Sequence, residues 1–101
     1  MFLYNVTIGI DKIAEEEFLQ WMTEHQVPRI METGYFSDSK IYKVIHDQND
    51  ESTSYSFQFF APTIKHVVNY LDLEAPAIME DLRKRFKDKH VAFQTLLEEV
   101  G

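Results

Sequence analysis

The sequence contains no cysteine. A disulfide framework, a thiolate metal site and a cysteine nucleophile are therefore excluded. Its three glycines, Gly9, Gly34 and Gly101, are scattered, so no glycine-rich loop cradles a phosphate. No apolar run approaches the roughly 20 residues that a bilayer-spanning helix needs. We therefore expect neither nucleotide binding nor membrane insertion.

Basic residues are also scarce. The chain has 10 Lys and Arg against 17 Asp and Glu, which gives a formal net charge of -7 and a pI near 4.9. This charge repels nucleic-acid backbones and anionic lipid surfaces. Met1 leads directly into a strand-like run without a basic leader, a start that is not typical of an exported protein. We expect a cytoplasmic protein with no nucleic-acid or membrane partner.

Apolar side chains are plentiful, because 45% of the 101 residues are hydrophobic and 14% are aromatic. That content is enough to build a core without metals or cross-links. The sequence shows no repeat, linker or low-complexity segment. We expect one domain over residues 1–101, and we expect it to need no cofactor and no metal ion.

The first third of the chain changes its apolar period once. Residues 2–10 alternate as a strand does, with Tyr4, Val6 and Ile8 on one face. From Asp11, a candidate N-cap, the period becomes helical and Glu15–Glu17 suit the positive end of the helix dipole. The predicted apolar stripe of this helix consists of Ile13, Phe18, Trp21, Met22 and His25. Pro28 interrupts the helix or starts a second short one, and Gly34 supplies a left-handed stop.

The rest of the chain predicts a hairpin, two helices and a last strand. Residues 36–46 and 53–61 alternate as strands on either side of a polar loop. Thr63 can cap a helix that buries Ile64, Val67, Val68 and Leu71. Ala75-Pro76 starts another helix, which runs to about Lys87 and is braced by Glu80 with Lys84 and by Asp81 with Arg85. Residues 90–98 alternate as a terminal strand.

This order, β-α-β-β-α-β, predicts an α+β ferredoxin-like sandwich with a four-stranded antiparallel sheet. The two helical segments cover one face of the sheet, so the other face meets water or a partner. That second face is semi-apolar, since we place Phe36, Tyr42, Val44, Phe60 and Leu96 on it. A large uncovered apolar surface is typical of a contact site, which favours a homodimer. The alternative is a monomer whose aromatic residues fill strand positions by β-propensity.

The segment from Trp21 to Phe36 carries a family resemblance. Its spacing, Trp-x3-His-x2-Pro-x5-Gly-x-Phe, resembles the dimeric α/β-barrel superfamily of ferredoxin-like proteins. Together with Tyr4-Asn5-Val6-Thr7 and the run from Ala92 to Glu98, it is similar to the DUF4286 family of uncharacterised bacterial proteins. The resemblance implies a dimer in which two sheets form one barrel with the helices outside. It implies no single reaction, because that superfamily includes cofactor-free monooxygenases, isomerases, haem degraders and proteins without assigned activity.

A barrel of this kind would gather polar residues from several strands on the second sheet face. The candidate ligand-binding residues are Asn5, Thr7, Tyr42, Ser54, Ser56, Gln58 and Gln94. With Leu3, Val44 and Phe60 they would line an apolar cavity that has a few hydrogen-bonding groups, suited to a small hydrophobic molecule. The alternative is that they are ordinary polar positions on a partly wet interface.

His25 and Tyr42 are the candidate acid–base residues. Histidine titrates near neutrality, and His25 lies one helical turn from Trp21 at the Pro28 break. The alternative reading of His25 is structural. His46 with Asp47 and Asp50 lacks a regular ligand spacing, so we predict a turn there and no metal. Haem-degrading relatives use an Asn, Trp and His set, but Trp21 and His25 lie in a different part of the chain from that set.

Three functions remain open. The first is a non-enzymatic dimeric module that binds a small ligand or a partner. The second is a cofactor-independent monooxygenase or isomerase that acts on a small hydrophobic substrate, with His25 or Tyr42 moving a proton. The third is a regulatory protein that acts through its acidic segments, Glu15–Glu17 and Asp47–Glu51.

Overall fold

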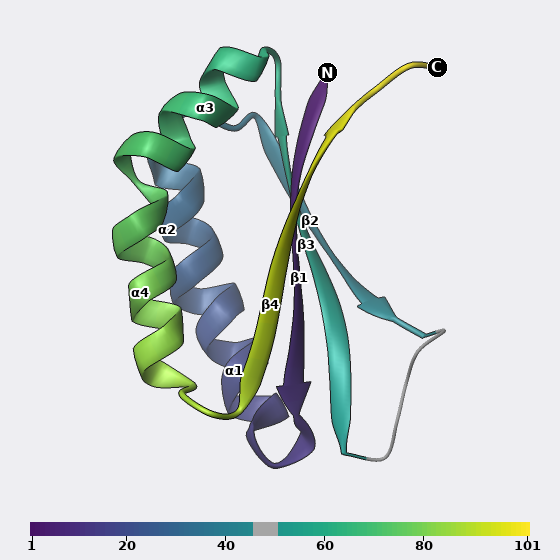
Figure 1. Ribbon diagram of the computed structural model, residues 1–101, viewed down its shortest axis with the longest axis vertical. Coiled ribbons are helices and arrows are strands. Elements are labelled where there is room, and N and C mark those ends of the chain that lie inside the picture. Colours follow the sequence, from purple (N-terminus) through teal and green to yellow (C-terminus); the bar gives the residue numbers. More distant parts are fainter. Residues whose placement is uncertain (46–50) are drawn as a thin grey trace.

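The four strands form one antiparallel sheet in the order β2-β3-β1-β4. The structure, a computed structural model, describes residues 1–45 and 51–101. The strands are β1 (Phe2–Asp11), β2 (Asp38–Val44), β3 (Ser52–Ala61) and β4 (His90–Glu98). The α-helices are α1 (Glu15–Trp21), α2 (Val27–Glu32), α3 (Ile64–Leu73) and α4 (Ala75–Arg85). All four helices lie on the same side of the sheet, and the opposite side is left open (Figure 1).

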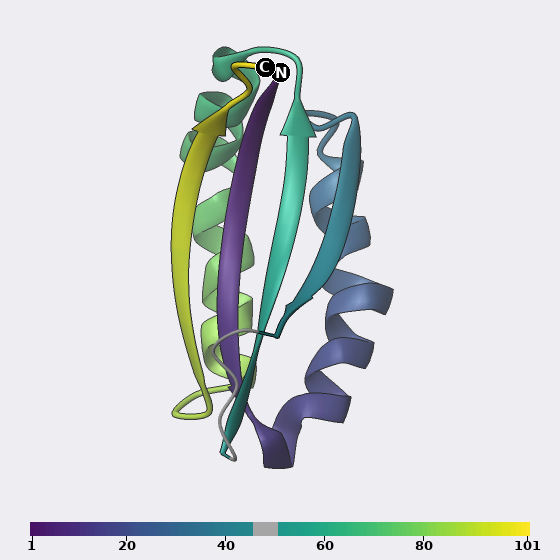
Figure 2. The ribbon, with the colours of Figure 1, turned by 90° about the vertical axis from the view of Figure 1, so that its right-hand side faces the viewer.

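The pairing register decides which residues face the helices. In the two central strands Tyr4 pairs with Phe59 and Val6 with Phe57, and all four side chains are buried under the helices. The alternate residues of β1, among them Asn5 and Thr7, therefore face the open side. Figure 2 looks at this open face, with β4 at one edge of the sheet and β2 at the other.

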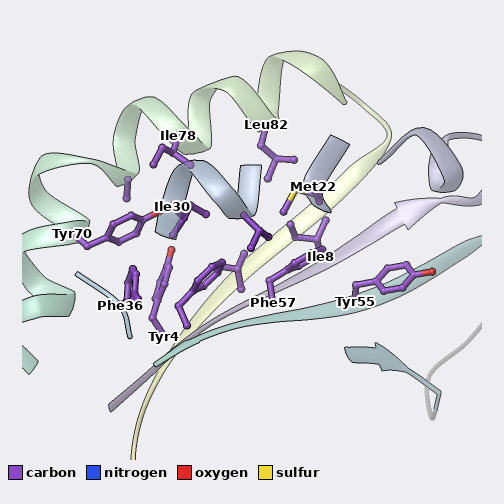
Figure 3. Close-up of a cluster of buried hydrophobic side chains, with 14 of the residues drawn as sticks. Tyr4, Ile8, Met22, Ile30, Phe36, Tyr55, Phe57, Tyr70, Ile78 and Leu82 are labelled. Carbon is purple, nitrogen blue, oxygen red and sulfur yellow. The ribbon is translucent and has the colours of Figure 1, made fainter. Parts of the chain in front are cut away.

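The core between sheet and helices is rich in aromatic rings. Tyr4, Phe36, Phe59 and Tyr70 form one cluster, in which the Phe36 and Tyr70 rings are 4.9 Å apart between centroids (Figure 3). Each such side chain contributes about 1.5–3 kcal/mol on burial. Phe36 therefore belongs to the core and the prediction that it lies on the second face is wrong, because the chain reaches the sheet only at Asp38.

The first helical segment runs through the proline without breaking. Pro28 has no N–H, and its ring would clash with the carbonyl of Glu24 in a regular α-helix. The backbone widens instead into a π turn over Met22–Gln26, in which the Val27 N–H donates to the Met22 carbonyl. Helix α2 then ends before Gly34, whose φ of 84° confirms the predicted left-handed stop.

The start of this segment differs from the prediction. Asp11 is the last residue of β1 and its side chain makes no cap hydrogen bond. A 3₁₀ turn, Lys12–Ala14, comes before α1 and points Ile13 into solvent with 89% of its surface exposed. Ile13 and His25, which is also exposed, are therefore not on the buried stripe, whereas Phe18 and Met22 are.

The second pair of helices confirms the predicted starts and corrects the contacts. The Thr63 side chain accepts from the His66 N–H and so caps α3. Val67 and Tyr70 form its buried face, whereas Ile64 and Val68 are exposed. The expected ion pairs Glu80–Lys84 and Asp81–Arg85 are not those that form. Glu80 pairs with Arg83, and Asp81 pairs across the helices with Arg29.

Candidate functional site

The open sheet face carries apolar side chains that no helix covers. Tyr42 on β2 is 51% exposed, Phe93 on β4 is 60% exposed and Val91 is 72% exposed. Leu97, on the same side of β4, is exposed as well. An apolar surface of this kind on a protein usually marks a contact or binding site.

A polar cluster lies at the centre of this face, on the two central strands. The Ser56 hydroxyl donates to Asn5 Oδ1 at 2.5 Å, and Asn5 Nδ2 donates to Thr7 Oγ1 at 2.9 Å. Gln58 Nε2 donates to Ser56 Oγ at 3.2 Å. These bonds hold Asn5 in one orientation. Asn5 is buried although it faces the open side. We call Asn5, Thr7, Ser56 and Gln58 the polar cluster.

The polar cluster lies between two hollows on the same face. One hollow, of about 330 Å³, is floored by Gly9 and lined by Ser54, Val91 and Phe93 among others. A Cβ on Gly9 would stand 3.4 Å from the Ser54 hydroxyl, so the glycine keeps this hollow open. The other, of about 270 Å³, lies over Leu3, Phe60 and Leu97. The first hollow combines Val91 and Phe93 with polar and charged residues, whereas the second is mainly apolar, so the polar cluster has apolar contact surface on both sides of it, most of it toward Leu3 and Phe60.

Most of the predicted ligand-binding residues share this face. Asn5, Thr7, Ser54, Ser56 and Gln58 occupy adjacent positions of β1 and β3, and Tyr42 pairs with Ser56 from β2. The prediction places Phe60 and Val44 there too, and the register confirms both.

Gln94 does not join them. It pairs with Val6, a residue that faces the helices, and Leu96 pairs with Tyr4 on that same side. The predicted position of Gln94 and Leu96 on the second face is therefore wrong, and the residues that β4 contributes are Val91, Phe93, Thr95 and Leu97. Both faces of β4 carry apolar residues, so the sequence held no signal that distinguished the open face of this strand from the helix-facing one.

His25 lies in a different part of the molecule from Tyr42. It belongs to the π turn on the helical side of the sheet and lines a groove with Trp21 and Arg85. The two candidate acid–base residues therefore cannot act in one site. His46, Asp47 and Asp50 lie outside the described residues. Within residues 1–45 and 51–101, no three His, Asp or Glu side chains group as metal ligands.

Glu15 has a specific role that its sequence context did not reveal. Its carboxylate accepts from the Tyr55 hydroxyl at 2.5 Å and from the Thr53 hydroxyl at 3.3 Å, which ties the start of α1 to β3. The Tyr55 hydrogen bond lowers the pKa of Glu15, whereas burial and Glu15 raise the pKa of Tyr55 to about 12. This carboxylate is occupied within the fold, so it is a poor candidate for an acidic contact surface.

A family model described as a domain of unknown function, DUF4286, matches residues 1–100. The chain belongs to this family. No curated protein sequence matches this DUF4286 chain. Of the helices in the described part of the chain, none is both long and apolar enough to span a membrane.

Solved structures share the fold of this DUF4286 protein at low sequence identity. HapK from Hahella chejuensis is 13% identical with a TM-score of 0.70, and the match covers 100% of this chain and 94% of HapK. A dimeric ferredoxin-like protein from an uncultured marine organism is 17% identical, with a TM-score of 0.67 and coverage of 100% and 96%.

SnoaB, a cofactor-independent oxygenase from Streptomyces nogalater, is 11% identical with a TM-score of 0.63 and coverage of 97% and 92%. At these identities the likeness establishes the ferredoxin-like fold and leaves the activity open.

Proposed function

We propose that this DUF4286 protein is a homodimer whose two open sheet faces pack together and hold a small hydrophobic molecule between them. The observation that carries the proposal is the polar cluster, a hydrogen-bonded set of side chains at the centre of an uncovered face whose outer strands expose Tyr42, Val91, Phe93 and Leu97. The protein would act as a binding module.

The dimer follows from what the open face exposes. Tyr42 and Phe93 stand on opposite outer strands of this face, and both keep more than half of their surface in solvent. Burial of apolar surface stabilises association by about 25 cal/mol per Å² before the entropic costs of binding. Pairing of two identical faces about a two-fold axis covers the exposed apolar side chains of both protomers at once. The ferredoxin-like relative described as dimeric is consistent with this arrangement.

The ligand follows from the hydrogen-bonding capacity that the polar cluster retains. Asn5 Nδ2 donates one of its two N–H groups to Thr7, and Gln58 Nε2 donates one of its two to Ser56. Within residues 1–45 and 51–101, no other hydrogen bond uses the second N–H of either amide or the carbonyl oxygen of Gln58, and these groups would orient a guest. A few hydrogen-bonding groups beside apolar residues such as Leu3, Phe60 and Phe93 are the usual composition of a small-molecule site.

The dimer is tested by changing Tyr42 to Asp. A carboxylate placed in the interface loses its hydration, which costs several kcal/mol on burial, so Tyr42→Asp should shift the mass from twice 12.0 kDa to 12.0 kDa. Light scattering behind size exclusion measures this mass. Lys84→Asp on α4 changes charge on the helical side and should leave the dimer intact. A wild-type mass of 12.0 kDa, or an intact Tyr42→Asp dimer, would refute the proposed interface.

The ligand site is tested with a matched pair of glutamine variants. Gln58→Leu removes a polar group from the open face, whereas Gln94→Leu makes the same change on the helix-facing side of β4. We expect the neutral fluorophore phenylnaphthylamine to bind the wild type, and its affinity to change in Gln58→Leu alone. Equal affinities in the two variants, in samples that are both dimers, would rule out the polar cluster as the site.

An enzyme on the same face is the second candidate, and Tyr42 favours it. Its hydroxyl-bearing ring stands on the open face opposite Ser56, where it could move a proton on a bound substrate. A cofactor-independent monooxygenase would consume oxygen with a hydroxylated aromatic compound such as naphthol, and Tyr42→Phe would abolish the uptake. An isomerase would instead exchange a substrate proton with solvent in a Tyr42-dependent way. His25 has no part in either reaction, because it lies across the sheet.

A further inference from the structure

A groove of about 570 Å³ runs along the helical side, between the first helical segment and α4. One wall comes from Trp21, His25 and Arg29, and the other from α4 with Asp81, Lys84 and Arg85. Gln26 closes the floor, since it is only 2% exposed and donates to the Ile78 carbonyl at 2.9 Å. The groove is thus formed by two helical elements that are joined by a buried hydrogen bond, and it lies on the opposite side of the sheet from the open face.

The π turn is what gives the groove its wall. It inserts an extra residue into the turn before Pro28, so that Gln26 reaches inward to α4 while His25 stays on the outer wall. Irregular turns of this kind are found frequently at functional sites.

The groove is positively charged although the protein as a whole is acidic. Its charged side chains, apart from His25, are three cations and one carboxylate, which leaves a net of two positive charges. Arg29 pairs with Asp81. Glu80, one helical turn before Lys84, pairs with Arg83 instead of Lys84. Lys84 and Arg85 therefore have no ion-pair partner among the described residues.

Trp21 provides an aromatic surface in the same groove. The Arg85 guanidinium lies 5.4 Å from the centroid of its ring, and Phe86 meets the ring edge-on at 5.7 Å. A guanidinium stacked in this way keeps its N–H groups available at its edge for a bidentate anion. Glu17 and Glu24 line a neighbouring hollow with Arg85, so an anion would approach from the side of Lys84.

We propose that this groove binds a small organic dianion of the phosphate monoester class. Arg85 and Lys84 hold the phosphate, whose charge of nearly two matches the net charge of the groove. The organic part lies along Trp21, because the hollow is far larger than a phosphate group alone. The site is separate from the sheet-face site of the proposed function and does not depend on it.

The unique tryptophan makes the test direct, since Trp21 is the only one in the chain. Phenyl phosphate should produce a saturable change in tryptophan fluorescence at constant ionic strength. Inorganic phosphate should bind more weakly, and neutral benzyl alcohol should give no saturable change. Because a substitution in the groove alters the surroundings of Trp21, calorimetry supplies the affinity of each variant.

Two variants of equal charge separate the groove from general electrostatics. Lys84→Gln should weaken phenyl phosphate binding by about tenfold, the loss expected for one charge-assisted contact. Lys87→Gln, just beyond the end of α4, removes the same charge outside the groove and should leave the affinity unchanged. No saturable phenyl phosphate signal, benzyl alcohol binding as tight as phenyl phosphate, or equal affinities for Lys84→Gln and Lys87→Gln would each overturn the proposal.

Discussion

Removal of the Tyr4 hydroxyl should stabilise the protein. Tyr4 is 2% exposed, and its hydroxyl is the only fully buried side-chain polar atom of the described residues that has no hydrogen-bond partner. Figure 3 shows this hydroxyl directed toward the helices, close to Tyr70. Burial raises the pKa of Tyr4 to about 12, which reflects the same loss of solvation. Tyr4→Phe keeps the ring and deletes only the atom that is poorly solvated.

The magnitude follows from the cost of burying a hydroxyl without a partner, which is about 1–3 kcal/mol. The ring contacts with Phe36 and Tyr70, at centroid distances of 6.1 and 5.6 Å, remain in Tyr4→Phe. We expect a gain of about 1 kcal/mol in the free energy of unfolding, or a rise of about 4 °C in Tm for a chain of this size.

Urea and thermal denaturation followed by circular dichroism measure this gain, at one fixed protomer concentration because association also stabilises. Tyr55→Phe is the matched control with the opposite sign. It removes a hydroxyl that donates to Glu15, and it should cost about 1 kcal/mol after solvent screening is allowed for. A Tyr4→Phe protein that is less stable than the wild type would refute the reasoning, since it would mean that the hydroxyl has a favourable partner.

Two further predictions concern pH and backbone conformation. Burial raises the pKa of Tyr4, Tyr55 and Tyr70, so the folded chain keeps protons that the unfolded chain releases above pH 10. The free energy of unfolding is therefore unaffected by these groups below pH 10, and above it should fall by up to roughly 4 kcal/mol per pH unit. Thermal unfolding between pH 8 and 12 measures this fall, and Tyr4→Phe should reduce its slope by about a third; a Tm that does not change above pH 10 would contradict it. Gly34→Ala should cost about 1 kcal/mol in urea denaturation, because a φ of 84° strains any residue with a Cβ although no atom lies within 4 Å of the added group; an unchanged midpoint would contradict that.

Local features of the fold were predictable where neighbouring residues in the chain decide the outcome. The last strand occupies His90–Glu98 as predicted, since its alternation is uninterrupted. The Thr63 cap and the Gly34 stop were predictable because each is local: the cap depends on the Thr63 hydroxyl and the adjacent backbone, and the stop depends on the missing Cβ of Gly34.

The candidate site was predictable on the central strands and not at the edge. On β1 and β3 one face is apolar and the other is polar except for Leu3 and Phe60, so Asn5 and Gln58 were placed correctly. Strand β4 has apolar residues on both faces, with Phe93 on one and Leu96 on the other. A period of two separates such faces without saying which one the helices cover, and Gln94 was misplaced for that reason.

The sequence by itself determined the order of elements, the Thr63 cap, the Gly34 stop and the alternation along each strand, because these depend on residues within a few positions of one another. Only the tertiary structure decided which face of β4 stays open and which charges pair. Arg29 reaches Asp81 across 52 positions, and Gln26 reaches Ile78 across the same separation. Contacts of that kind depend on how helices pack against each other. As a result, Lys84 and Arg85 do not form the ion pairs with Glu80 and Asp81 that helical spacing alone predicts.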